Sequence, residues 1–129
     1  MEQSVYLIDT NAVIDYLEKR LPAIGMDFMG LVTGAVPTIS IITKIELFGF
    51  KASAEHHRLL TGFMNDVFVL ELTNDIVEKC IDIRKRHKID LPDVIIAATA
   101  LARNSVLISR NVSDFRKIQG LQVIDPHRL

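Results

Sequence analysis

The sequence has little of several features that would narrow its role at once. The net charge is −1 over 129 residues, so no overall field attracts nucleic acid, and any such contact must come from a local basic patch. The single cysteine, Cys80, excludes an internal disulfide and is typical of a reducing compartment. We therefore expect a cytoplasmic protein.

Signals for secretion, membrane insertion and zinc binding are also missing. The amino terminus lacks a basic region followed by a long apolar stretch, and no apolar run approaches the ~20 residues of a membrane helix. The four histidines lack paired zinc spacing, and one cysteine cannot complete a zinc cluster. Aromatic residues make up only 6% of the chain, and we expect Phe28, Phe63 and Phe68 to pack in the core rather than stack on bases.

The remaining pattern is that of an α/β protein with a single domain over residues 1–129. Short apolar runs alternate with longer helical patterns, and the length suffices for a proper core. The expected strands are Val5–Ile8, Val36–Ile39, Val67–Leu72, Val106–Ile108 and Gln122–Ile124. These runs are continuous rather than alternating, which favours a mostly parallel sheet covered on both faces, with right-handed crossovers.

Helices are expected between the strands. Their ranges are Ala12–Arg20, Pro22–Val32, Ser40–Phe48, Ser53–Met64, Thr73–His87, Leu91–Arg103 and Ser113–Ile118, in which each Ser or Thr serves as a cap. We expect Ile24 and Leu31 to face inward from the second helix and Leu59 from the fourth. Both helices nevertheless carry more large apolar residues than one narrow stripe needs, so we expect part of their surface to contact partners.

Four acidic residues stand in or beside strongly apolar sequence: Asp9, Glu46, Asp93 and Asp114. Acidic residues are rarely buried unless something pairs with them. Open parallel sheets place ligands just beyond the carboxyl ends of their strands, where Asp9 follows the first strand and Asp114 follows the fourth. If the fold brings the four carboxylates together, they form a site that needs a divalent cation.

Each carboxylate also has a purely structural interpretation. Asp9 is suited to cap the helix that follows it, and Asp93 and Asp114 lie in first turns, where the helix dipole favours negative charge. Glu46 is harder to explain, because it shares or borders an apolar stripe and Lys44, two residues away, points elsewhere. The sequence alone leaves their convergence open.

The chain resembles the PIN-domain family and, within it, the compact VapC-like toxin ribonucleases. The matching motifs are Asp9-Thr10-Asn11, Ile41-Thr43-Glu46-Leu47, Leu91-Pro92-Asp93-Ile96-Ala97-Ala98 and Asn111-Asp114-Phe115. Their order spans residues 5–124. One departure is Ser109, where such proteins usually carry Thr, although the hydroxyl is kept. The resemblance implies a three-layer sandwich around a five-stranded sheet of order 3-2-1-4-5.

The resemblance also implies a Mg²⁺- or Mn²⁺-dependent endoribonuclease that hydrolyses RNA phosphodiester bonds. Its catalytic and metal-site residues would be Asp9, Glu46, Asp93 and Asp114, with Asp9 and Asp93 as the closest ligands. Asn11 and Ser109 would be polar supports. Hard oxygen ligands select these cations, and a bound ion lowers the pKa of water.

Basic residues near the acidic motifs are candidate contacts for RNA phosphate. Arg110 adjoins the fourth acidic motif, and the run Arg84–Lys88 precedes Asp93. The run is equally explained as a solvated helix end favoured by the helix dipole. The resemblance further implies a homodimer and a cognate antitoxin that blocks the site.

Two other functions compete with this one. The first is a catalytically inactive PIN-like module that binds RNA or protein, against which all four acidic positions argue. The second is a phosphate-signalling receiver, which also carries an acidic pocket on an α/β sheet. Its adjacent acidic pair near the first strand and its late-strand lysine are absent.

Overall fold

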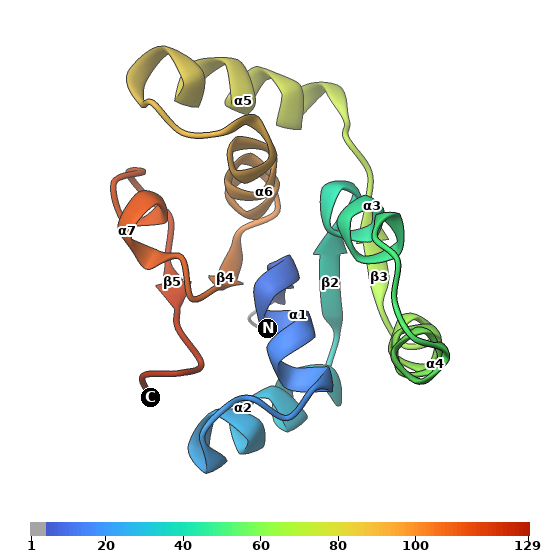
Figure 1. Cartoon of the computed structure of the whole chain (residues 1–129). Coiled ribbons are helices and arrows are strands. Elements are labelled where there is room, and N and C mark those ends of the chain that lie inside the picture. Colours follow the sequence, from blue (N-terminus) through green and yellow to red (C-terminus); the bar gives the residue numbers. More distant parts are fainter. Residues whose placement is uncertain (1–4) are drawn as a thin grey trace.

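Strands and helices alternate along the computed structural model, which describes residues 5–129 (Figure 1). The strands are β1 (Val5–Ile8), β2 (Pro37–Ser40), β3 (Phe68–Leu70), β4 (Ser105–Ile108) and β5 (Val123–Ile124). The helices are α1 (Thr10–Leu17), α2 (Ala23–Thr33), α3 (Ile41–Gly49), α4 (Ala54–Met64), α5 (Asn74–Arg86), α6 (Leu91–Ala102) and α7 (Val112–Phe115). All five expected strands are therefore present, with small shifts at their ends.

The five strands form one parallel sheet in the order β3-β2-β1-β4-β5, as predicted. Leu7 of the central strand β1 pairs with Thr38 of β2 on one side and Leu107 of β4 on the other. From β1 the chain first builds outward through β2 and β3, and then returns to build β4 and β5 on the opposite side. The strand order therefore reverses between β1 and β4, where parallel sheets form their ligand crevice.

Successive residues of the central strands point to opposite faces of the sheet and enter two separate cores. Leu7 and Leu107 join the core made with α5 and α6, whereas Ile8 and Ile108 join the core made with α1, α2 and α4. Figure 1 shows α5 and α6 together on one side of the molecule and α1 and α2 on the other. Helix α6 is almost wholly buried from Val94 to Ala100, which confirms its central position.

Side-chain caps fix where several helices begin. Ser40 accepts a hydrogen bond from the Ile42 amide, and Ser53 accepts one from the His56 amide, as the sequence predicts. Two expected starts are wrong. Helix α1 begins at Thr10 rather than Ala12, because Asp9 is its cap, and α7 begins at Val112, with Asn111 before it, rather than after Ser113.

Some apolar residues expected inside are exposed. Ile24 and Leu31 on α2 are 63% and 76% exposed, and Leu59 on α4 is 41% exposed. These helices bury only one stripe, represented by Met29 and Leu60, and in Figure 1 they lie in the lower part of the molecule, away from α5 and α6. Phe68 is also exposed, so its assignment to the core is wrong. The expectation that α2 and α4 leave apolar surface uncovered is confirmed.

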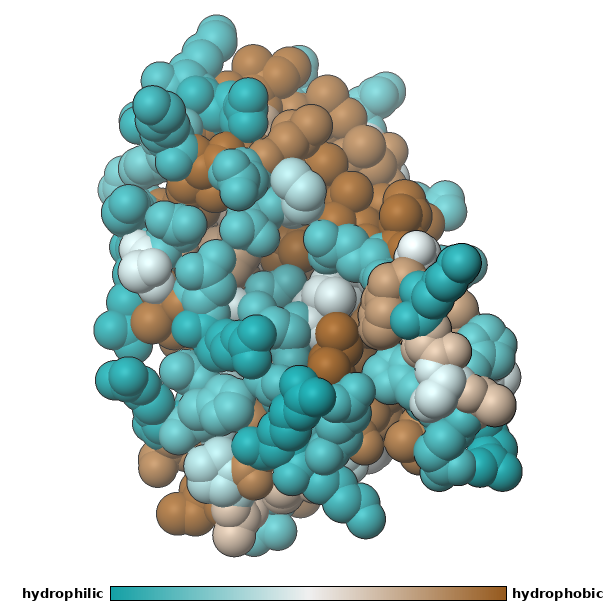
Figure 2. Space-filling view, in the orientation of Figure 1, coloured by the Kyte–Doolittle hydropathy of each residue, from teal (hydrophilic) through white to brown (hydrophobic). Residues whose placement is uncertain are grey.

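Another exposed apolar area lies over α5 and the start of α6. Val77, Ile81 and Leu91 contribute to it and line a hollow of about 490 Å³. Figure 2 shows hydrophobic residues gathered on the upper part of the visible face, among hydrophilic ones. Over residues 5–129, no helix combines the length and hydrophobicity needed to cross a membrane.

Candidate active site

Asp9 lies at the sheet's crevice, directly after β1. Its backbone amide continues the pairing with β4 by donating to the Ile108 carbonyl at 2.9 Å. The side chain is only 4% exposed, and its Oδ1 accepts a hydrogen bond from the Thr10 amide at 2.8 Å. Its Oδ2 accepts from the Ser109 hydroxyl at 2.7 Å and from Asn11 Nδ2 at 3.1 Å. Asp9 is thus both a helix cap and a buried carboxylate held by neutral donors.

Asn11 and Ser109, the two residues proposed as polar supports, belong to this same network. Besides donating to Asp9, the Ser109 hydroxyl accepts from the Asn111 amide at 3.0 Å and lies 3.3 Å from Asn11 Nδ2. Asn11 Oδ1 accepts from the Arg110 amide at 3.2 Å. The network therefore ties the start of α1 to the segment after β4 and fixes the Asp9 carboxylate in one orientation.

Glu46 reaches the same edge from α3, with its side chain exposed rather than embedded in an apolar stripe. Its Oε1 accepts a hydrogen bond from the Thr10 hydroxyl at 2.6 Å, and the buried Thr43 hydroxyl lies 3.1 Å from that of Thr10. A hydroxyl has one proton to donate, so Thr10 donates to Glu46 and accepts from Thr43. Thr10 and Thr43 lie within the matching motifs, but their role here was not foreseen.

Asp93 and Asp114 complete the group from α6 and α7. Asn111 Nδ2 donates to Asp93 Oδ2 at 3.2 Å, and Lys117 Nζ lies 3.5 Å from Asp114 Oδ1. Burial raises the pKa of Asp93 from 3.8 to about 6, helped by the charges of Asp9, Glu46 and Asp114. Burial also raises the pKa of Asp9, against the lowering effect of its hydrogen bonds. Asp93 therefore lies within electrostatic reach of the other three predicted acidic residues, and Asp9 within reach of Glu46.

The donor chemistry of this site suits Mg²⁺ or Mn²⁺, which prefer oxygen ligands. Mutual repulsion among the carboxylates is the strain that a cation relieves. Among residues 5–129, however, no three His, Cys, Asp or Glu side chains are arranged closely enough to hold an ion. The carboxylates thus fit the ion in kind and charge without forming a closed set of ligands.

A second cluster, on the inward side of α1, was not predicted. Asp15 is 2% exposed, and its Oδ2 lies 3.1 Å from Arg110 Nη1 and 2.9 Å from His127 Nε2. Arg110, the predicted phosphate contact, therefore has its guanidinium on Asp15, although 57% of its side chain is exposed. A carboxylate three residues after the buried Ala12, on the apolar stripe of α1, was the available signal.

The fold and site together define an α/β protein with an acidic edge, and comparison with known proteins gives its family. The PIN domain family matches residues 6–121. Ribonuclease VapC1 of Methanocaldococcus jannaschii is 28% identical over 96% of this chain and 90% of its own length. Ribonuclease VapC1 of Haemophilus influenzae is 31% identical over 92% of this chain and 95% of its own. The chain belongs to the PIN-domain family.

Solved structures support the same fold. VapBC from Salmonella typhimurium, bound to DNA, superposes with a TM-score of 0.78 at 26% identity, over 96% of this chain and 99% of the other. VapBC-1 from nontypeable Haemophilus influenzae gives a TM-score of 0.76 at 29% identity, over 95% and 98%. The sheet order and the flanking helices are therefore those of a known group of toxin-antitoxin structures.

Proposed function

We propose that this protein is an endoribonuclease that hydrolyses RNA phosphodiester bonds with the help of Mg²⁺ or Mn²⁺. The observation that carries the proposal is the gathering of Asp9, Glu46, Asp93 and Asp114 at the sheet's crevice, from four different elements. The relatives named ribonuclease VapC1 support RNA as the substrate. We also propose that the protein is located in the cytoplasm.

Each carboxylate has a role in the proposed reaction. Asp9 and Asp93 would be the closest ligands of an ion, because Asp9 is fixed by Ser109 and Asp93 by Asn111. Glu46 and Asp114 would act through water or hold a second ion. The chemistry that a bound ion would supply is charge stabilisation at the phosphate and a lower pKa for a water molecule. A carboxylate that the ion does not fully engage accepts the proton of the attacking water.

The proposal is tested by cleavage of labelled RNA in Mg²⁺, Mn²⁺, Ca²⁺ or excess chelator. We expect Mg²⁺ and Mn²⁺ to support cleavage and Ca²⁺ to support it poorly, because its looser coordination orients water less strictly. The open arrangement of the carboxylates favours one alternative, a PIN-like module that binds RNA or protein without cutting. Undiminished cleavage in chelator would contradict the metal requirement, and binding without cleavage in every metal would favour the alternative.

We further propose that the protein is the toxin of a toxin-antitoxin pair and forms a homodimer. Solved relatives described as VapBC support an antitoxin partner. The apolar surfaces at Ile24 and Leu31 on α2, and at Val77 and Ile81 on α5, offer area for two kinds of contact. Light scattering that finds only monomer at tens of micromolar, on the order of weak dimer constants, would contradict the homodimer.

A further inference from the structure

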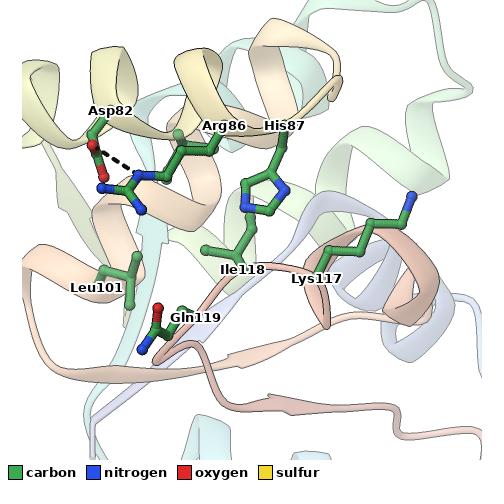
Figure 3. Close-up of a pocket in the computed structure, with 8 residues that line it drawn as sticks. Asp82, Arg86, His87, Leu101, Lys117, Ile118 and Gln119 are labelled. Atoms are coloured by element: carbon green, nitrogen blue, oxygen red, sulfur yellow. Dashed lines mark hydrogen bonds and ion pairs between the residues drawn. The ribbon is translucent and has the colours of Figure 1, made fainter.

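A hollow of about 430 Å³ lies between the end of α5, the end of α6 and the segment after α7 (Figure 3). Lys117 lines the hollow, and its Nζ lies 3.5 Å from Asp114 Oδ1. Concave sites for small ligands in proteins occupy roughly 300–1,000 Å³. The hollow is therefore large enough for a single nucleotide, and Lys117 connects it to Asp114 of the candidate active site.

Cationic and polar groups stand around its rim. Arg86 and His87 come from the end of α5, whereas Lys117 and Gln119 come from the segment after α7. In Figure 3 the His87 ring lies just above Ile118, and Lys117 stands on the right of the pair. Arg86 Nε donates to Asp82 Oδ1 at 3.1 Å, which orients its guanidinium and leaves further N–H donors free for a phosphate.

The floor of the hollow is apolar and firmly held. Ile118 is 3% exposed, and Leu101 packs under Gly120. Gly120 has a φ of +85°, and the Leu121 amide donates to the Ile118 carbonyl at 3.3 Å. This is a tight turn whose third residue requires glycine, and it fixes Gln119 at the rim.

Helix electrostatics explain only part of this arrangement. The dipole of α5 favours basic residues in its last turn, and Arg86 forms an i,i+4 pair with Asp82 that stabilises the helix by itself. Lys117 likewise forms an i,i+3 pair with Asp114, but neither pair explains why Lys117 and Gln119, from another segment, line the same hollow as Arg86. Cations from two segments around an apolar floor form a site that suits the phosphates and the base of one nucleotide.

We propose that this hollow binds a nucleotide of single-stranded RNA adjacent to the bond that is cut, an inference that rests on the proposed function. Lys117 contacts the phosphate on one side of this nucleotide, and Arg86 contacts the phosphate on the other side. The base lies on Leu101 and Ile118, against the His87 ring. The Gln119 amide, which both donates and accepts hydrogen bonds, contacts the base edge and selects among bases.

The test is the affinity of fluorescein-labelled single-stranded RNA, roughly ten nucleotides long, measured by anisotropy in chelator. Lys117→Gln should raise Kd about 3- to 10-fold for every sequence and reduce the salt slope by about one. Gln119→Leu should instead change the ranking of RNAs that differ at one base, by about 10-fold. Lys79→Gln, an exposed change on α5 outside the hollow, is the control and should bind like the wild type.

Cleavage in Mg²⁺ or Mn²⁺ is measured in parallel, so that the two proposals can fail separately. A wild type that binds RNA as predicted but never cuts it would contradict the proposed function alone. A wild type that cuts RNA while Lys117→Gln and Gln119→Leu bind like Lys79→Gln would overturn the nucleotide site alone. A Lys117 effect without any change in base ranking for Gln119→Leu would overturn it too, because diffuse attraction then suffices.

Discussion

Asp9 and Asp15 lie at opposite ends of helix α1 and differ little in burial, at 4% and 2% exposure, yet their surroundings are opposite in charge. Asp15 meets Arg110 and His127. Asp9 is held by the Thr10 amide, Asn11 and Ser109, all neutral. The two aspartates are therefore similarly buried and differ in the charge of their partners, which is why we propose a functional role for Asp9 and a structural role for Asp15.

The charges of Asp15 and Asp9 are balanced in different ways. Around Asp15 the protein supplies its own positive charge, and the pairing fastens Arg110 and the carboxyl-terminal segment to α1. Gly25 on α2 allows the carboxyl-terminal segment to approach the helix closely, because a Cβ there would lie 2.1 Å from the Pro126 carbonyl oxygen. Around Asp9 three further carboxylates add negative charge; Lys117 pairs with Asp114, and we propose that a divalent cation balances the others.

The largest expected effect concerns the acidic edge. Asp93→Asn should reduce RNA cleavage by about 100-fold or more, because it removes a carboxylate that binds the ion or moves a proton. The matched control is Asp90→Asn, an exposed carboxylate just before α6 that should retain cleavage. Initial rates on labelled RNA measure both variants. Similar rates for Asp93→Asn and Asp90→Asn would remove the distinction between functional and structural carboxylates.

The same isosteric change at Asp15 should act on stability. Asp15→Asn removes the charge that attracts Arg110 and His127, and should lower the free energy of unfolding by about 1–2 kcal/mol. The partly exposed partners regain water, which keeps the loss below that of a fully buried pair. Urea denaturation measures it against Asp27→Asn, an exposed carboxylate on α2. Equal midpoints for the two variants would contradict a structural role for Asp15.

Arg110 connects the two regions, because its backbone amide bonds Asn11 while its guanidinium pairs with Asp15. Its remaining N–H donors face solvent and suit phosphate. Arg110→Ala should raise the Kd for RNA about 10-fold and Lys88→Ala about 2-fold. Anisotropy at a temperature where both variants are folded decides the order. Equal small effects would leave only diffuse electrostatics, and a larger effect at Lys88 would reverse the assignment.

A smaller effect should appear in the pH dependence of stability. The pKa of Asp93 is raised to about 6 in the folded protein, so protonation favours folding. Without metal, the contribution of Asp93 to the free energy of unfolding should therefore be largest below about pH 4. It should fall by on the order of 1 kcal/mol as the pH rises through 6. The loss is smaller than the whole pKa shift implies, because Asp93 is partly exposed and solvent screens its charge. Comparing wild type and Asp93→Asn isolates this contribution, and parallel stability profiles would contradict it.

Local sequence patterns predict some elements of this protein and misplace others. Continuous apolar runs predict the strands, and Ser40 and Ser53 are predicted correctly as caps, because both signals are local. The sheet order came from the resemblance. Ile24 and Leu31 were placed wrongly, because helical spacing shows that two apolar stripes exist without showing which one meets the sheet.

Within the site, the four acidic residues were predicted and most of their partners were not. Asp15 is separated from Arg110 by 95 residues and from His127 by 112, and no local pattern reports such a pairing. The bonds from Thr10 to Glu46 and from Asn111 to Asp93 likewise depend on how helices meet at the sheet edge. Which side chains pair across elements depends on how the helices and strands pack together. No short stretch of sequence predicts that packing.

We propose that the acidic edge stores like-charge repulsion and that a divalent cation relieves it. Thermal unfolding of the wild type and Asp93→Asn, each with and without Mg²⁺, is the decisive measurement. Without metal, Asp93→Asn should be equally stable or more stable, by on the order of 1 kcal/mol. Mg²⁺ should narrow that difference, because it stabilises the wild type by binding its folded state. The contrary result is that Asp93→Asn is less stable than the wild type and that Mg²⁺ changes the melting temperature of neither protein. That result would show that Asp93 only stabilises the first turn of α6.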